Sequence, residues 1–278
     1  MTPPRRRYRT DLTDAQWQVL GSLIPQPKPG GRPVLHQRRE LLNAMLYWLR
    51  AGCAWRLLAH DLPPGRPSTT TSAAGGWRGV GSGSCGYCAL ASGSARAGAH
   101  AERRSPGQPE RADHRRGGPY GYDGAKRVNG RKRHLLVDIL GLLLAVHVSP
   151  ANVSDQDGAA ELLGRLDRRQ LPRLRYGWAD GGYRGAFLAW ALARSKIAFQ
   201  VVARADGGRR RRWLPPGVEP PIVPRFAVVP RRWGVERTFT WLGRFRRLSK
   251  DYEFLPVTSE AVIYLAMIQL LVRRLAGK

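Results

Sequence analysis

Residues 64–117 divide this chain of 278 residues into two parts that can fold and one part that has no protein-like pattern. The segment holds eleven glycines, lacks Ile, Met and Phe, and has only Val80 and Leu90 as branched aliphatic residues. Neither helical nor strand periodicity survives in it, and structureless connections of this length are uncommon inside a compact domain. We therefore expect any hydrophobic core to be built from the residues before and after this segment.

Residues 8–62 have the pattern of a small helical domain. Thr13 can cap a helix from about Asp14 to Leu23, and a second helix is predicted over 35–51, with Gly52 as its C-cap. Short helices with a basic surface suit a helix-turn-helix-like DNA-binding domain. The alternative is a helical layer that covers the following domain.

Residues 118–276 alternate between predicted strands and helices. A β-hairpin is predicted around Leu140–Gly141, between two apolar runs. Further strands are predicted over 174–179, 197–203 and 225–229, and helices over 155–166, 184–193, 232–249 and 258–275. This succession indicates a mixed α/β layer fold.

The charge balance indicates a polyanionic partner. Lys and Arg number 47 against 20 Asp and Glu, which gives a formal net charge of +27. Guanidinium groups bind phosphate with two parallel hydrogen bonds, so nucleic acid is the favoured partner. A GC-rich genome that favours Arg codons would also raise this count, and RNA binding rests on charge alone.

The sequence does not have the features of membrane or secreted proteins. No run approaches the roughly 18 apolar residues of a membrane-spanning helix, and the longest apolar stretch, 261–272, is typical of a core helix. The first residues lack the apolar segment of a secretory signal, and three cysteines suit a reducing compartment. We therefore expect a cytoplasmic protein.

Two carboxylates are candidates for chemistry. Asp180 follows a predicted strand and precedes Gly181–Gly182, which leave room for a ligand at the carboxyl edge of a sheet. A carboxylate there can bind a divalent cation or, alternatively, cap the next helix. Glu236 shares a predicted helix face with Arg232, which suits either a metal ligand within a phosphate-binding track or a surface ion-pair network.

Eight short motifs occur in the order that one protein family shows. They lie at 11–17, 30–33, 49–56, 118–124, 130–134, 178–183, 235–239 and 246–253. Together they resemble a DDE-type transposase of bacterial insertion sequences, from the group named after insertion sequence five. The resemblance covers residues 8–62 and 118–276.

This resemblance implies a DNA-binding region over 8–62 and a catalytic domain of ribonuclease-H-like fold over 118–276. It implies double-stranded DNA as partner (transposon ends and target), a homodimer on DNA, and association with the bacterial nucleoid when bound. Family enzymes hold two Mg²⁺ (or Mn²⁺) ions with three acidic residues for phosphoryl transfer, and Asp180 matches the second acid and Glu236 the third. Seven basic residues are expected to contact DNA: Arg232, Arg237, Arg244, Arg247, Lys126, Arg131 and Lys132.

The first family Asp is absent from this chain. The family places it in an Asp-Ser-Gln-Ser segment ahead of the 118–124 motif, where this sequence reads Ser-Pro-Gly-Gln-Pro-Glu-Arg. Suitable codons for residues 107–111, read from the second base, spell Asp-Ser-Gln-Ser. We therefore hypothesise that residues 63–117 are an out-of-frame, disordered translation product, in which Cys85 and Cys88 have no role.

A chain that lacks one of three metal-binding acids is expected to be a transposase by descent with defective catalysis. Asp113 and Asp123 lie in no matching motif, and Asp138, on the predicted hairpin, either approaches the metal site or is structural. Two other functions remain open. One is a DNA-binding protein without catalysis that occupies the terminal inverted repeats, and the other is a structure-specific nuclease.

Overall fold

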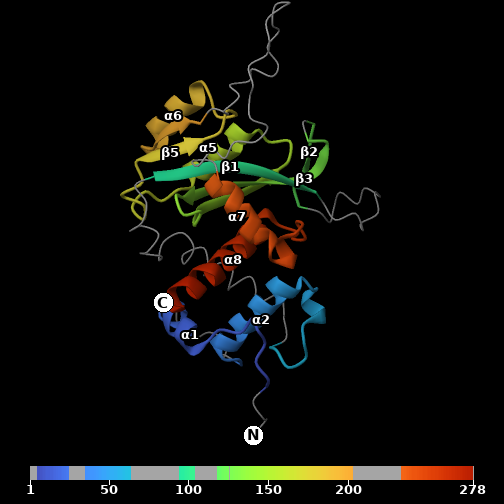
Figure 1. The fold of residues 1–278 in the computed structure, drawn as a ribbon. Helices are drawn as coiled ribbons and strands as arrows, with labels where there is room; N and C mark the ends of the chain where they lie inside the picture. The colour runs from blue at the N-terminus through green and yellow to red at the C-terminus, as the bar shows by residue number, and fades with distance from the viewer. Residues whose placement is uncertain are drawn as a thin grey trace, which may run out of the picture.

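The computed structural model describes residues 5–24, 35–63, 94–103, 118–124, 126–202 and 233–277. These residues form a mixed sheet with helices on both faces, and a further helical layer lies on one of these helices (Figure 1). The mixed α/β class expected for the second half of the chain is therefore confirmed.

The sheet has six strands, in the order β2-β3-β1-β5-β6, with β4 paired to β3. The antiparallel strands are β2 (Gly121–Asp123), β3 (Val128–Asp138) and β4 (Leu143–Pro150). β1 (Ser94–Arg103) is antiparallel to β3 and parallel to β5 (Tyr176–Ala179), which is parallel to β6 (Ala198–Val201). β3 and β4 form the predicted hairpin, whose turn uses Gly141 at a φ of 79°.

β1 lies inside the segment that we expected to be disordered. That expectation is wrong for residues 94–103, because they pair with β3 from Ala95 opposite Asp138 to Arg103 opposite Gly130. The strand also pairs with β5 over Ser94–Arg96, so main-chain hydrogen bonds hold it in the sheet without an alternation of apolar side chains. Pro63 is also described. The other residues of 63–117, Cys85 and Cys88 among them, lie outside the described part of the chain.

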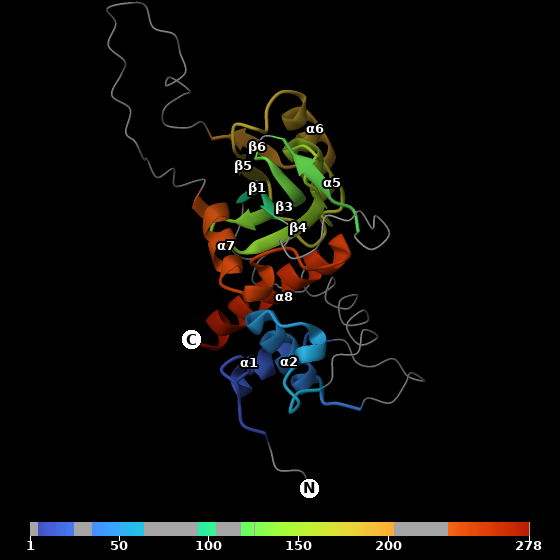
Figure 2. The same ribbon diagram turned by 90° about the vertical axis from the view of Figure 1, so that its right-hand side faces the viewer.

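Helices cover both faces of the sheet (Figure 2). α5 (Asp155–Gly164) and α6 (Ala186–Ser195) lie on one face, and α7 (Trp233–Gly243) and α8 (Pro256–Ala276) lie on the other. Ser154 caps α5, and its Oγ accepts the N–H of Asp157 at 3.0 Å. Because of this double cover, β4 is buried along almost its whole length.

The N-terminal helices pack on α8 and form one continuous core with the sheet domain. α1 (Asp14–Gly21) begins with a capping box between Thr13 and Gln16, and α2 (Arg38–Ala51) ends at Gly52 with a φ of 70°, as predicted. The short 3₁₀ helix η3 (Arg246–Leu248) packs against α2 and α7, and a second one, η1 (Trp55–Leu57), follows α2 along the chain. This arrangement matches the alternative in which the N-terminal helices form a layer that covers the following domain.

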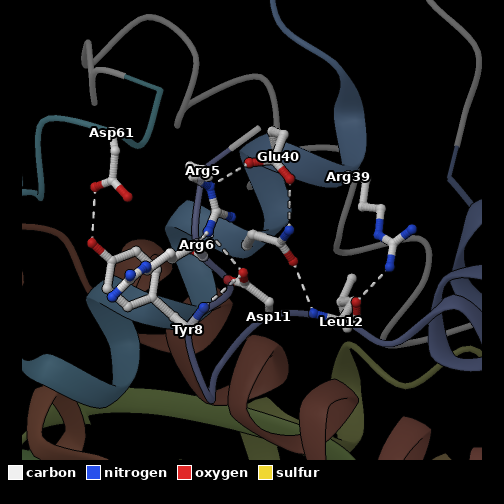
Figure 3. Close-up of polar contacts among 9 residues, drawn as sticks. Arg5, Arg6, Tyr8, Asp11, Leu12, Arg39, Glu40 and Asp61 are labelled. Atoms are coloured by element: carbon white, nitrogen blue, oxygen red, sulfur yellow. Dashed lines mark hydrogen bonds and ion pairs between the residues drawn. The ribbon is translucent and has the colours of Figure 1, made fainter. Parts of the chain in front are cut away.

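Ion pairs and hydrogen bonds fix the N-terminal segment on α2 (Figure 3). Arg5 pairs with Asp11 and with Glu40, both at 2.8 Å. The buried Asn43 accepts the N–H of Leu12 at 2.9 Å. These contacts hold the start of the described chain against α2.

α8 is the central helix of the molecule, because it packs on β4 on one side and on α1 and α2 on the other. Its length and composition alone would allow it to cross a membrane, but 67% of the apolar window is buried inside the protein. The helix therefore behaves as the core helix that the sequence predicts.

Candidate functional site

Asp180 directly follows the last residue of β5, at the carboxyl end of this strand. Its Oδ1 accepts the N–H of Gly182 at 2.9 Å, and its carbonyl accepts the N–H of Tyr183 at 3.1 Å. The N-cap of α6 is Gly185, so the alternative in which Asp180 caps this helix is wrong. Asp180 instead closes a tight turn and stays half-buried at the sheet edge.

Glu236 lies in the first turn of α7, and its side chain is exposed. α7 packs against β3 and β1, and β1 is the neighbour of β5, which leads to Asp180. The Glu236 carboxylate makes no ion pair with any described residue. The described part of the chain therefore does not support a surface ion-pair network at Glu236. Arg232, the proposed partner on the same face, lies outside the described part of the chain.

The described residues do not fit a site for two metal ions. No group of three His, Cys, Asp or Glu side chains among them lies close enough together to hold an ion. Arg96 of β1 pairs with Trp178, so the register, continued by two residues, places Gly98 beside Asp180. β1 contains no Asp, and its single Glu, Glu102, lies four residues farther along. The strand next to Asp180 therefore has no carboxylate at the corresponding level.

Asp138 has a structural role in the β3–β4 turn. Its Oδ1 accepts the N–H groups of Leu140 at 2.9 Å and of Leu142 at 2.7 Å. The side chain is fully buried, and burial raises the pKa of its carboxyl group. Asp138 pairs with Ala95, which pairs with Gly177 of β5, so Asp138 lies two strands away from β5 and three residues before the level of Asp180.

Two of the basic residues expected to contact DNA are buried in β3, and the expectation is wrong for them. Arg131 pairs with Asp251 at 3.0 Å and donates to three main-chain carbonyls. Lys132 pairs with Asp155 at 2.9 Å, and both cations are only 6% exposed. Their charges are used to join β3 to neighbouring loops, because a buried cation needs a partner.

Arg247 is also used inside the protein rather than on a DNA-facing surface. Its guanidinium lies 4.6 Å from the ring centroid of Trp48 in α2 and 5.2 Å from that of Tyr252. It pairs with Glu253 at 2.7 Å, while both side chains are mostly buried. Arg247 therefore joins the N-terminal helical layer to the segment before α8, which corrects its assignment to DNA.

Three of the expected DNA contacts remain accessible. Arg244 and Lys126 are exposed, and Arg237 is half-buried, with Nη2 donating to the carbonyl of Ile139 at 3.3 Å. Arg274 was not among the expected residues, although its guanidinium shares the ring of Trp241 with Arg237. The one signal for it in the sequence is a pair of arginines at the end of an otherwise apolar helix.

His147, a buried residue of β4, lies near two carboxylates, of which Glu260 is buried and Glu161 is exposed. His147 Nδ1 is 3.2 Å from Glu260 Oε1, and Nε2 is 3.2 Å from Glu161 Oε2. The two carboxylates thus approach different ring nitrogens and do not share a point at which an ion could bind. This arrangement suits a structural contact between β4, α5 and α8 rather than a metal site.

The sequence matches two models of transposase families. Residues 102–271 match the model described as "Transposase DDE domain", and residues 12–81 match "Putative transposase of IS4/5 family". The second match extends into the segment that we took to be out of frame, and residues 82–101 lie between the two matches. The resemblance to a DDE-type transposase of bacterial insertion sequences is therefore confirmed.

A curated relative carries the description "Putative transposase for insertion sequence element IS402" and comes from Burkholderia cepacia. It is 32% identical over 129 residues, which are 45% of this chain and 54% of the relative. The chain therefore spans about half the length of this relative. No solved structure matches the chain. Because the DDE-domain match covers more than half of its residues, the chain belongs to the DDE transposase family of bacterial insertion sequences.

Proposed function

We propose that this protein binds double-stranded DNA at the ends of an insertion sequence and at its target, as a homodimer on the bacterial nucleoid. The observation that carries the proposal is the DDE-domain match over 102–271, within which Asp180 follows β5 and Glu236 lies on α7. The formal charge of +27 supports a polyanionic partner. A pair of DNA ends to be joined requires at least two bound copies.

The arrangement of strands supports a ribonuclease-H-like fold for the second half of the chain. β1 is antiparallel to β3 and parallel to β5, so the sheet is mixed, and helices cover both of its faces. Asp180 stands at the carboxyl end of a parallel strand, where open α/β sheets place their ligands.

The N-terminal layer supports a DNA-binding role beside its packing role. α2 buries one side against α8 and η3, while arginines of the same layer remain exposed to solvent: Arg6, Arg7, Arg9, Arg50 and Arg56. Exposed guanidinium groups on short helices can contact the phosphates of duplex DNA.

We infer that catalysis is defective in this chain. Mg²⁺ and Mn²⁺ require several oxygen ligands in fixed geometry, and the family's reaction depends on two such ions. In this structure Asp180 and Glu236 have no third carboxylate from β1, whose residue at the level of Asp180 is Gly98. This favours the alternative function, in which the protein occupies the terminal inverted repeats without cutting them.

The function can be tested with duplexes that carry the ends of the element. We expect sequence-specific binding in a gel-shift assay, unchanged by Asp180→Ala, and no cleaved or joined product with Mg²⁺ or Mn²⁺. Joined products that disappear with Asp180→Ala would show that catalysis is intact. Products that are cut but never joined would indicate a nuclease, and failure to bind any duplex would refute the proposal as a whole.

The nucleotide sequence tests the proposed origin of the defect. If the reading frame is shifted, the codons of residues 107–111 spell Asp-Ser-Gln-Ser in another frame, and restoring that frame returns the missing Asp. The two family matches cover 63–81 and 102–117 and leave only 82–101 of this segment unmatched, so the nucleotide sequence has to decide the origin of the defect. Codons that cannot spell the segment in any frame would rule it out.

A further inference from the structure

Trp241, in the last turn of α7, is held between two arginines. The Arg274 guanidinium, from the end of α8, lies 4.4 Å from the ring centroid, and that of Arg237, one turn earlier on α7, lies 5.1 Å from it. Both are within the range of a cation–π contact. The ring thus brings together cations from two helices that would otherwise repel each other.

A buried carboxylate lies behind this pair of arginines. The charges of Arg237 and Arg274 both favour the ionised form of Asp138, whose Oδ2 has no hydrogen-bond partner among the described residues. Arg237 also donates to the carbonyl of Ile139, and Thr238 Oγ1 donates to that of Gly141 at 2.6 Å. The β3–β4 turn therefore fixes α7 and Arg237 in place, and one buried negative charge faces two positive ones.

The cluster lies where the N-terminal layer meets the α7–α8 layer. Arg273, next to Arg274, donates to the carbonyl of Arg9 at 3.5 Å, and Figure 1 shows the end of α8 beside α1. Arg9, Arg273 and Arg274 are all exposed. The positive charge of this surface thus comes from both parts of the chain.

We propose that Arg237, Trp241 and Arg274 form a phosphate-binding clamp for duplex DNA at this junction. The proposal rests on the proposed function and extends it from Arg237, which lies in a family motif, to Trp241 and Arg274, which lie outside the motifs. A guanidinium held on an aromatic ring loses less freedom when it binds, and the exposed guanidinium of Arg274 can still donate two hydrogen bonds to a phosphate. Arg237, which already donates to Ile139, adds a second positive charge. Because α7 also carries Glu236, a phosphate bound here would fix the DNA relative to the helix of the candidate site.

The salt dependence of DNA binding tests the clamp. Each lost phosphate contact reduces the slope of log affinity against log salt by about one. Between 50 and 200 mM salt, the factor by which the affinity falls should therefore be about fourfold smaller for Arg274→Gln than for the unchanged chain. At 50 mM salt Arg274→Gln should bind more weakly. Arg237→Gln should reduce the slope in the same way, which provides a second variant on the other side of Trp241.

Arg194→Gln is the matched control, because Arg194 is an exposed arginine on α6, across the sheet from α7 and α8. It should leave the slope unchanged, and equal melting temperatures would show that all variants fold. If the unchanged chain binds DNA and both clamp variants keep its slope, the clamp is refuted while the proposed function stands. If the unchanged chain binds no DNA, the proposed function itself fails.

Discussion

Replacing Gly158 with Ala tests how closely α5 packs on strand β3 of the sheet. Gly158 lies in the first half of α5, and a Cβ added there would collide with three ring atoms of His134 in β3. The ring has little room to move, because it is 1% exposed and its Nε2 lies 2.8 Å from Ser149 Oγ. The new methyl group must therefore displace either the helix or the ring.

Two opposing effects decide how much Gly158→Ala changes the free energy of unfolding. An Ala in a helix is favoured over Gly by about 1 kcal/mol. Overpacking a buried site costs about 1–3 kcal/mol, and loss of the hydrogen bond to Ser149 would cost about 1 kcal/mol more. We expect Gly158→Ala to lower the free energy of unfolding by about 2 kcal/mol, which corresponds to roughly 4–8 °C in Tm for a chain of this size.

Gly164→Ala, in the same helix, is the matched control. A Cβ at Gly164 would meet nothing within 4 Å, so this variant should be as stable as the unchanged chain or gain up to about 1 kcal/mol. Thermal and urea unfolding followed by circular dichroism measure both variants. If Gly158→Ala is no less stable than Gly164→Ala, the packing of α5 on His134 is wrong.

Two further predictions concern buried charges. Burial and the neighbouring His147 lower the pKa of His134 to about 4, whereas its usual value is 6.5, so the unfolded chain takes up a proton first. The free energy of unfolding should therefore fall as the pH drops from 6.5 towards 4, by at most about 3 kcal/mol, and His134→Gln should reduce this dependence in urea titrations at several pH values. Arg131→Met should destabilise the protein by about 3–5 kcal/mol, because it leaves the buried carboxylate of Asp251 without its ion pair, whereas the exposed Arg244→Met should change stability by less than about 0.5 kcal/mol. Equal stability of these two arginine variants in urea unfolding would contradict the structural role of Arg131.

Local signals predicted many elements of this fold. The capping box at Thr13, the C-cap at Gly52 and the turn at Gly141 are each defined by a few neighbouring residues, and all three are present. β1 could not be predicted in this way. Its Ala- and Gly-rich sequence has no apolar period, and its place in the sheet depends on pairing with β3 and β5, which follow much later in the chain.

The candidate site was predictable only in part, for a similar reason. A sequence shows that Arg131 and Arg247 are cations, but their partners Asp251 and Trp48 lie far away along the chain. Motif resemblance therefore assigned to DNA three side chains that the fold uses internally: Arg131, Lys132 and Arg247. Conversely, Arg274 becomes a candidate only when α7 and α8 bring it to Trp241.

Counting the metal ions that this chain binds tests the inference that its catalytic site is incomplete. Mn²⁺ is titrated into the full chain bound to a duplex that carries an end of the element, and free Mn²⁺ is measured by electron paramagnetic resonance. We predict no tightly bound ion that depends on Asp180, so Asp180→Ala and the unchanged chain should give the same titration curve. Two ions bound per chain, and lost with Asp180→Ala, would contradict the account.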